Sequence, residues 1–131
     1  MKSKQISVLI YGHDARLLES RKWVLQSCGY RALSVRHLAD LNRVPLIPAV
    51  DLLVLCYTLV PRECESAIAH AKLRWPNVKE LALVRYNANA AREIPSVLPD
   101  IQKTLDAPDP LLSMVGQLVG HATSSSYSHI Y

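Results

Sequence analysis

The sequence has no phenylalanine and only four glycines among its 131 residues, so its large aromatic side chains are two tryptophans and six tyrosines. It also contains no apolar stretch close to the roughly 20 residues that a membrane-spanning helix needs. Its first residues are polar, and the apolar run that follows them is too short for a signal peptide. We therefore expect a cytoplasmic protein with no membrane partner, in which Trp23 and Trp75 pack in the core.

Cysteine is scarce, and its pattern excludes two common uses. The three cysteines, Cys28, Cys56 and Cys64, are odd in number and form no CxxC pair. A disulfide framework needs an even set, and zinc sites are typically built from closely spaced pairs. We therefore expect reduced thiols in a reducing compartment.

Positive charge is in excess, but the basic residues are scattered along the chain. The net charge is +4 and the isoelectric point is near 9.1, yet no run of five like charges occurs. Nucleic-acid surfaces usually need a clustered basic stripe, so we expect no nucleic-acid partner. Half of the residues are hydrophobic and a fifth are charged, which predicts one globular domain over residues 1–120. The Ser-rich residues 121–131 are expected to form a flexible tail.

Short apolar runs alternate with segments of helical periodicity, which predicts a parallel α/β sheet. Asp14 is a good N-cap, Gly29 is a stop signal, and Pro61 suits the first turn of a helix. The predicted strands cover residues 6–11, 30–35, 51–56, 80–86 and 101–105. The predicted helices cover residues 15–27, 37–42, 61–74 and 89–93, with a last helix from Pro110 to Gly120.

This order of elements resembles the receiver domain of bacterial response regulators. The resemblance is carried by residues 6–30, by Asp51-Leu-Leu-Val-Leu-Cys56, and by Asp109-Pro110-Leu-Leu at the start of the last helix. It implies a three-layer, flavodoxin-like fold with a five-stranded parallel sheet of strand order 2-1-3-4-5 and helices on both faces.

The resemblance also assigns the positions of the family's phosphorylation site. Its acidic pair falls on Gly12 and His13, with Asp14 next to them, and its phosphoryl acceptor falls on Cys56. The hydroxyl at the end of the fourth strand falls on Val84, so that Arg85 takes the small-residue position after it, and the lysine falls near Asp106. A salt bridge between Arg85 and Asp106 would then fill the former cleft.

These substitutions remove the chemistry of the family. Magnesium prefers hard oxygen ligands, and Gly12 and Cys56 supply none. Phosphoryl transfer needs an oxygen nucleophile and a metal that holds the charge. We therefore expect a degenerate receiver that is not an enzyme, with no metal or cofactor, acting by protein–protein interaction in a two-component-type pathway.

Three other hypotheses stay open at this point. Cys56 could be a redox-sensing thiol activated by Arg85 and His13, although a buried, inert cysteine is the plainer expectation. His13, Asp14 and Cys56 could converge as metal ligands. The domain could bind a small ligand, although the turn after the first strand lacks the repeated glycines of a nucleotide fingerprint.

The last helix offers the best candidate for a partner surface. Its apolar residues should mostly cover the sheet, and any remainder could bind a signalling protein or a second copy of the chain. Tyr86 would add an aromatic side chain to that face. The apolar residues of the last helix are Leu111, Leu112, Val115 and Leu118.

Overall fold

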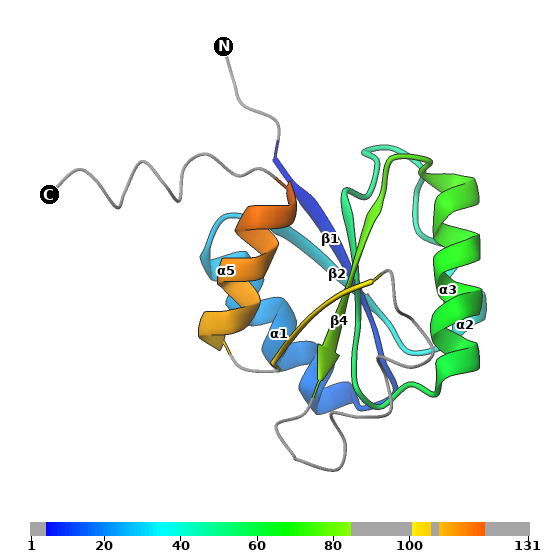
Figure 1. The fold of residues 1–131 in the computed structure, drawn as a ribbon. Helices are drawn as coiled ribbons and strands as arrows, with labels where there is room; N and C mark the ends of the chain where they lie inside the picture. Colours follow the sequence, from blue (N-terminus) through cyan, green and yellow to red (C-terminus); the bar gives the residue numbers. More distant parts are fainter. Residues whose placement is uncertain (1–4, 85–100, 106–107, 120–131) are drawn as a thin grey trace, which may run out of the picture.

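The structure is a computed structural model that describes residues 5–84, 101–105 and 108–119. Elements are labelled as in Figure 1. The strands are β1 (Ser7–Tyr11), β2 (Arg31–Val35), β3 (Leu52–Leu55), β4 (Lys79–Val84) and β5 (Gln102–Leu105). The helices are α1 (Ala15–Ser27), α2 (Leu38–Leu41), α3 (Pro61–Arg74) and α5 (Pro108–Val119).

The five strands form one parallel sheet in the order β2-β1-β3-β4-β5. Helices α1 and α5 cover one face of this sheet, and α2 and α3 cover the other (Figure 1). The predicted three-layer fold and its strand order are therefore confirmed. A parallel sheet covered on both faces also explains why β1 and β3 are apolar at nearly every position.

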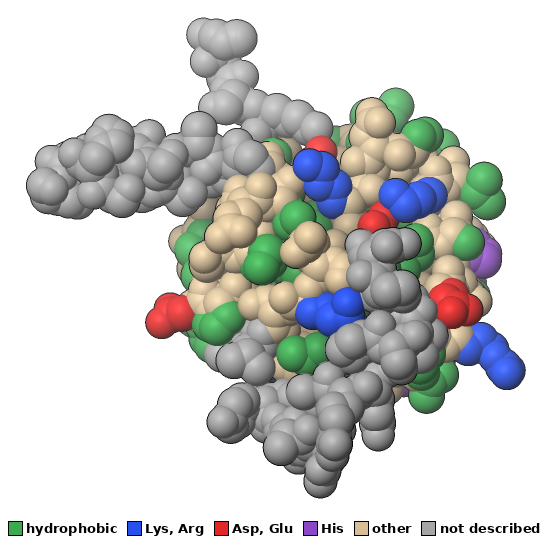
Figure 2. Space-filling view, viewed as in Figure 1, with side chains coloured by type: hydrophobic (Ala, Val, Ile, Leu, Met, Phe, Trp, Pro, Cys, Tyr) green, Lys and Arg blue, Asp and Glu red, His purple; other side chains and the backbone are tan. Residues whose placement is uncertain are grey.

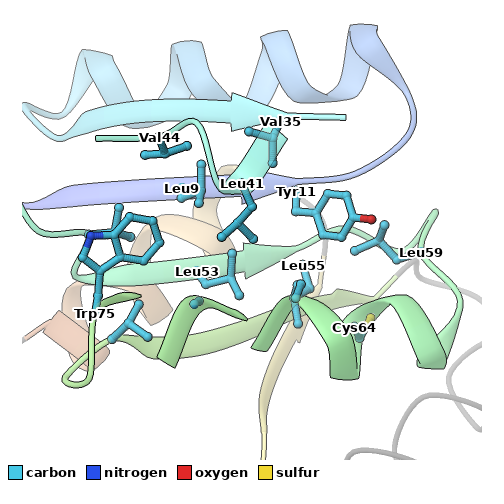
Figure 3. Packing of buried hydrophobic residues seen from close by; sticks show 14 residues of the cluster. Leu9, Tyr11, Val35, Leu41, Val44, Leu53, Leu55, Leu59, Cys64 and Trp75 are labelled. Carbon is cyan, nitrogen blue, oxygen red and sulfur yellow. The ribbon is translucent and has the colours of Figure 1, made fainter. Parts of the chain in front are cut away.

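Alternate residues of the two central strands feed two separate core layers. Leu9 and Leu53 point toward α3, whereas Val8 and Leu52 point toward α1 and α5, and all four are fully buried. In the α3 layer, Trp75 and Tyr11 lie on opposite sides of Leu9, Leu41 and Leu53 (Figure 3). Both aromatic residues are almost fully buried and so contribute large apolar surfaces to this layer.

Local signals fix both ends of α1 as the sequence predicts. The Asp14 carboxylate accepts hydrogen bonds from the backbone N–H groups of Arg16 and Leu17, at 2.9 and 3.3 Å. Gly29 follows the helix with a φ of 92°, a backbone conformation that residues with a Cβ rarely adopt. Pro61 likewise begins α3, where its missing N–H removes no intrahelical bond.

Two sequence-based expectations are wrong in detail. Trp23 does not pack in the core: 72% of it is exposed. It follows the buried Leu18 by five residues, which places it about 140° around the helix from the face that covers the sheet. The last helix begins at Pro108, two residues before Pro110, because the first helical turn tolerates proline.

Several expectations lie outside the described residues. They are the predicted helix at 89–93, the last two residues of the predicted strand 80–86, Gly120 and the tail at 121–131. Among the described helices, none is long and apolar enough to span a membrane.

The central strands should dominate the stability of the domain. Truncating the fully buried Leu53 to alanine should lower the free energy of unfolding by about 2–5 kcal/mol, because it leaves a cavity beneath α3. Leu73→Ala is the matched control: Leu73 is 84% exposed, and its loss should change stability by less than about 0.5 kcal/mol. Urea unfolding measures both, and equal effects would contradict the described packing.

Candidate functional site

The carboxyl ends of the parallel strands meet at one edge of the sheet, the lower edge in Figure 1. The loop after β1 and the loop after β3 are neighbours there because their strands pair directly. The Cys56 N–H donates to the Tyr11 carbonyl at 3.0 Å, and the Gly12 N–H donates to the Val35 carbonyl at 3.2 Å. Three predicted site residues, Gly12, His13 and Cys56, are thereby brought together.

Gly12 and Cys56 are packed so closely that no side chain fits at position 12. A Cβ placed on Gly12 would lie 2.8 Å from the Cβ and 3.1 Å from the Sγ of Cys56. It would also lie 3.3 Å from the Thr58 hydroxyl oxygen. Carbon atoms in contact normally stay about 3.5–4.0 Å apart, so a carboxylate could enter here only if one strand end moved.

His13 ties the two loops together. Its backbone N–H donates to the Thr58 Oγ1 at 3.0 Å, and its ring Nε2 lies 2.8 and 2.9 Å from the two carboxylate oxygens of Glu63. Its ring also meets Tyr11 edge to face, with the ring centroids 6.1 Å apart. The imidazole of His13 therefore binds the first turn of α3 through Glu63.

Glu63 joins the β3–α3 loop to the first turn of α3 through its carboxylate. Its Oε1 accepts the Val60 backbone N–H at 2.9 Å, which is one half of a capping box. Val60 has no side-chain acceptor, so the other half is missing. The hydrogen bond from the Val60 N–H is the largest of the effects that hold the pKa of the Glu63 carboxyl below its ordinary value. Burial opposes it, and the hydrogen bond and charge of His13 lower the pKa further. The same carboxylate adds to burial in raising the pKa of Tyr11.

The three cysteines form no disulfide and lie in different surroundings. Cys56 is only 3% exposed, whereas Cys28 lies exposed at the end of α1. Burial, with the charges of Glu63 and Glu65, raises the pKa of Cys64 to about 11, so this thiol stays protonated at neutral pH. The burial of Cys56 favours its interpretation as a packing residue over that of a redox sensor, because a sensor thiol needs access to its oxidant.

The structure does not assemble the suggested three-ligand metal site. Asp14 uses its carboxylate to cap α1, and the His13 ring is paired with Glu63. Within residues 5–84, 101–105 and 108–119, no group of three His, Cys, Asp or Glu side chains is arranged to hold a metal ion. The hypothesis that His13, Asp14 and Cys56 converge on a metal is therefore wrong.

The remaining predicted positions divide into two groups. Val84 is the last residue of β4 and is half-buried. Arg85, Tyr86 and Asp106 lie outside the described residues, so the Arg85–Asp106 salt bridge and the role of Tyr86 stay predictions.

The proposed partner face on α5 needs correction. Leu111 and Val115 are fully buried against the sheet, so they cannot be part of a partner surface. Leu112 and Leu118 are half-buried and retain some exposure. Where described side chains are visible in Figure 2, hydrophobic groups reach the surface over α5 in separate spots. The apolar face of α5 mostly serves the core.

Two residues of the site, Thr58 and Glu63, were not singled out by the sequence analysis. Glu63 had a local signal, since it is the third residue of a helix that begins at Pro61, the position where glutamate caps helices. Thr58 had none, because its contact with His13 depends on two loops that are 45 residues apart in the chain.

No protein-family model matches the sequence. Nor does any curated protein. Solved structures do match. A response regulator receiver protein from Sinorhizobium medicae has a TM-score of 0.69 at 20% identity, covering 89% of this chain and 96% of that one. The signal receiver domain of an HD domain-containing protein from Pseudomonas fluorescens has a TM-score of 0.67 at 14% identity, covering 92% and 99%.

A chemotaxis protein from Vibrio cholerae also matches, with a TM-score of 0.66 at 11% identity, and 88% of this chain and 99% of that one are covered. The chain has a receiver-like fold. Since these identities are low, the likeness concerns the path of the backbone, and the activity of this receiver-like domain must be argued from its own residues.

The Gly12–Cys56 contact predicts a specific steric coupling. Gly12→Ala should lower the free energy of unfolding by about 1–3 kcal/mol, because the new methyl group meets Cys56. Gly12 has no positive φ, so backbone strain should not contribute. The cost should persist in a Cys56→Ala background, which keeps the Cβ, and shrink in a Cys56→Gly background. An identical cost in all three backgrounds, measured by urea unfolding, would rule out the contact.

Glu63 predicts a pH-dependent contribution to stability. Because its pKa is lowered in the folded state, its stabilisation is complete above its ordinary pKa and is lost as the pH falls through the lowered value. Glu63→Gln should therefore cost about 1 kcal/mol at pH 7 and little in acid, where the native carboxyl is also neutral. Glu65→Gln, an exposed position on the same helix, is the control. Thermal unfolding at several pH values measures the cost of Glu63→Gln. A cost that does not change with pH would contradict the lowered pKa of Glu63.

Proposed function

We propose that this receiver-like domain is a non-catalytic signalling module that acts through protein–protein interaction and does not depend on phosphorylation. The observation that carries the proposal is the contact between Gly12 and Cys56, which occupies the place where the resemblance puts a metal-binding carboxylate and the phosphoryl acceptor.

The chemistry at this edge of the sheet does not support aspartyl phosphorylation. Cys56 follows β3 directly, where the acceptor would stand, but its thiol is buried and is not a carboxylate. Gly12 contributes no metal ligand, and Val84 at the end of β4 contributes no hydroxyl. A transferred phosphoryl group would thus meet neither an oxygen nucleophile nor a bound cation to hold its charge.

The loops that a cation and a phosphoryl group would otherwise organise are already joined by protein groups. His13 bridges from the β1–α1 loop to Thr58 and Glu63 in the β3–α3 segment. We infer that these contacts hold the domain in one arrangement, which a partner would recognise without a prior phosphorylation step.

The partner is expected to be another signalling protein of a two-component-type pathway in the cytoplasm. The fold supports this, since the matched structures are a response regulator receiver protein, a signal receiver domain and a chemotaxis protein. A homodimer through the exposed parts of α5, including Leu112 and Leu118, is the second form of the same proposal.

Intact-mass spectrometry after incubation with acetyl phosphate and Mg²⁺ tests the proposal. We expect no phosphoryl adduct, because the described edge of the sheet offers neither acceptor nor metal site, while an authentic receiver treated in parallel gains one phosphoryl group. Cys56→Ser serves as the locating variant, since an adduct that survives it does not lie on the thiol. A stable adduct on Asp14 or Asp51 would refute the proposal.

A further inference from the structure

A hollow lies away from the Gly12–Cys56 contact, beside the edge strand β2. It is a groove of about 520 Å³ between the first turns of α1, the end of β2 and α2. Its inner surface includes Leu18 and Val35, which are both buried. Binding sites for small ligands typically measure about 300–1,000 Å³, so the groove has room for a side chain or a small molecule.

The groove is lined by two acidic residues, Glu19 and Asp40, and two basic residues, Arg36 and Arg43. Of its two acidic residues, Glu19 pairs with Lys22 at 3.7 Å, and Asp40 pairs with Arg43 at 3.8 Å. Arg36 also lines the groove, is exposed, and makes no ion pair with any residue that the structure describes.

An exposed aromatic side chain continues this surface along α1. Trp23 follows Glu19 by four residues, so the two lie on the same side of the helix, about 6 Å apart along its axis. Tryptophan and arginine are the residue types most often found at the energetic centre of protein interfaces. An occupant that reaches both Arg36 and Trp23 must extend past the groove, as a peptide segment does and a single amino acid does not.

We propose that the groove and Trp23 together bind an acidic segment of a partner protein, with a glutamate or aspartate side chain of that segment pairing with Arg36. Guanidinium groups bind carboxylates through two parallel hydrogen bonds, which fixes the register of the bound segment. Apolar side chains beside the carboxylate would pack on Trp23. This inference rests on the proposed function and gives the partner a chemical class.

The test is an NMR titration of the full, ¹⁵N-labelled chain with a short synthetic peptide in which glutamate alternates with alanine and leucine. Amide shifts should concentrate in residues 15–23 and 34–40. Arg36→Ala should weaken binding by about ten-fold or more, the effect of one lost charge-assisted pair. Arg62→Ala removes another exposed arginine, on α3 and outside the groove, and should change the affinity by less than about two-fold.

Three outcomes would overturn the inference. The first is equal binding of a peptide with glutamine in place of glutamate, and the second is an equal loss in Arg36→Ala and Arg62→Ala. The third is binding of free glutamate as tight as that of the peptide, with no effect of Trp23→Ala, which would make the site one for a small carboxylate. Weakened peptide binding in Trp23→Ala supports the inference. The acetyl phosphate experiment is independent: a phosphoryl adduct would refute the proposed function even if the peptide binds.

Discussion

Strands β1 and β3 end side by side in the middle of the sheet, and the residues that follow them meet without a gap. Gly12 approaches the Cβ of Cys56 so closely that the edge of the sheet is closed at this point by backbone and thiol. This contact depends on the direct pairing of the two strands, whose side chains fill both core layers. A change at either residue therefore affects the ends of two buried strands at once. The same contact fixes where the β1–α1 and β3–α3 loops begin.

The loops are held by a few polar contacts whose individual strength is modest. The His13–Glu63 pair is partly exposed, with 43% and 33% of the two side chains accessible, and exposed pairs contribute about 0–1 kcal/mol. Glu63 is worth more than this pair alone because it also caps α3, and the His13 backbone is fixed independently by Thr58. Several weak contacts on one short segment thus join the β1–α1 loop to the start of α3.

The fold was predictable because its signals are local. Unbroken apolar runs in β1 and β3, the cap at Asp14 and proline at Pro61 each act within a few residues. The hydrophobic character of Trp23 favoured a core position, but Leu18 and Leu25 define the buried side of α1 and Trp23 lies on another side of that helix. The apolar pattern of α5 predicted a helix with one hydrophobic side, but only the packed structure shows that Leu111 and Val115 face the sheet.

The site was predictable only in part, because it is made by loops that are far apart in the chain. Cys56 and Gly12 could be placed from the resemblance, whereas the Thr58 contact requires the tertiary structure.

The central claim is that this edge of the sheet is closed and has one arrangement. Its most direct test is to compare amide NMR spectra of the labelled chain before and after adding Mg²⁺ with beryllofluoride, a mimic of a bound phosphoryl group. Superimposable spectra are predicted; shifts concentrated at Gly12, His13 and Cys56 would show a working acceptor site and contradict the account.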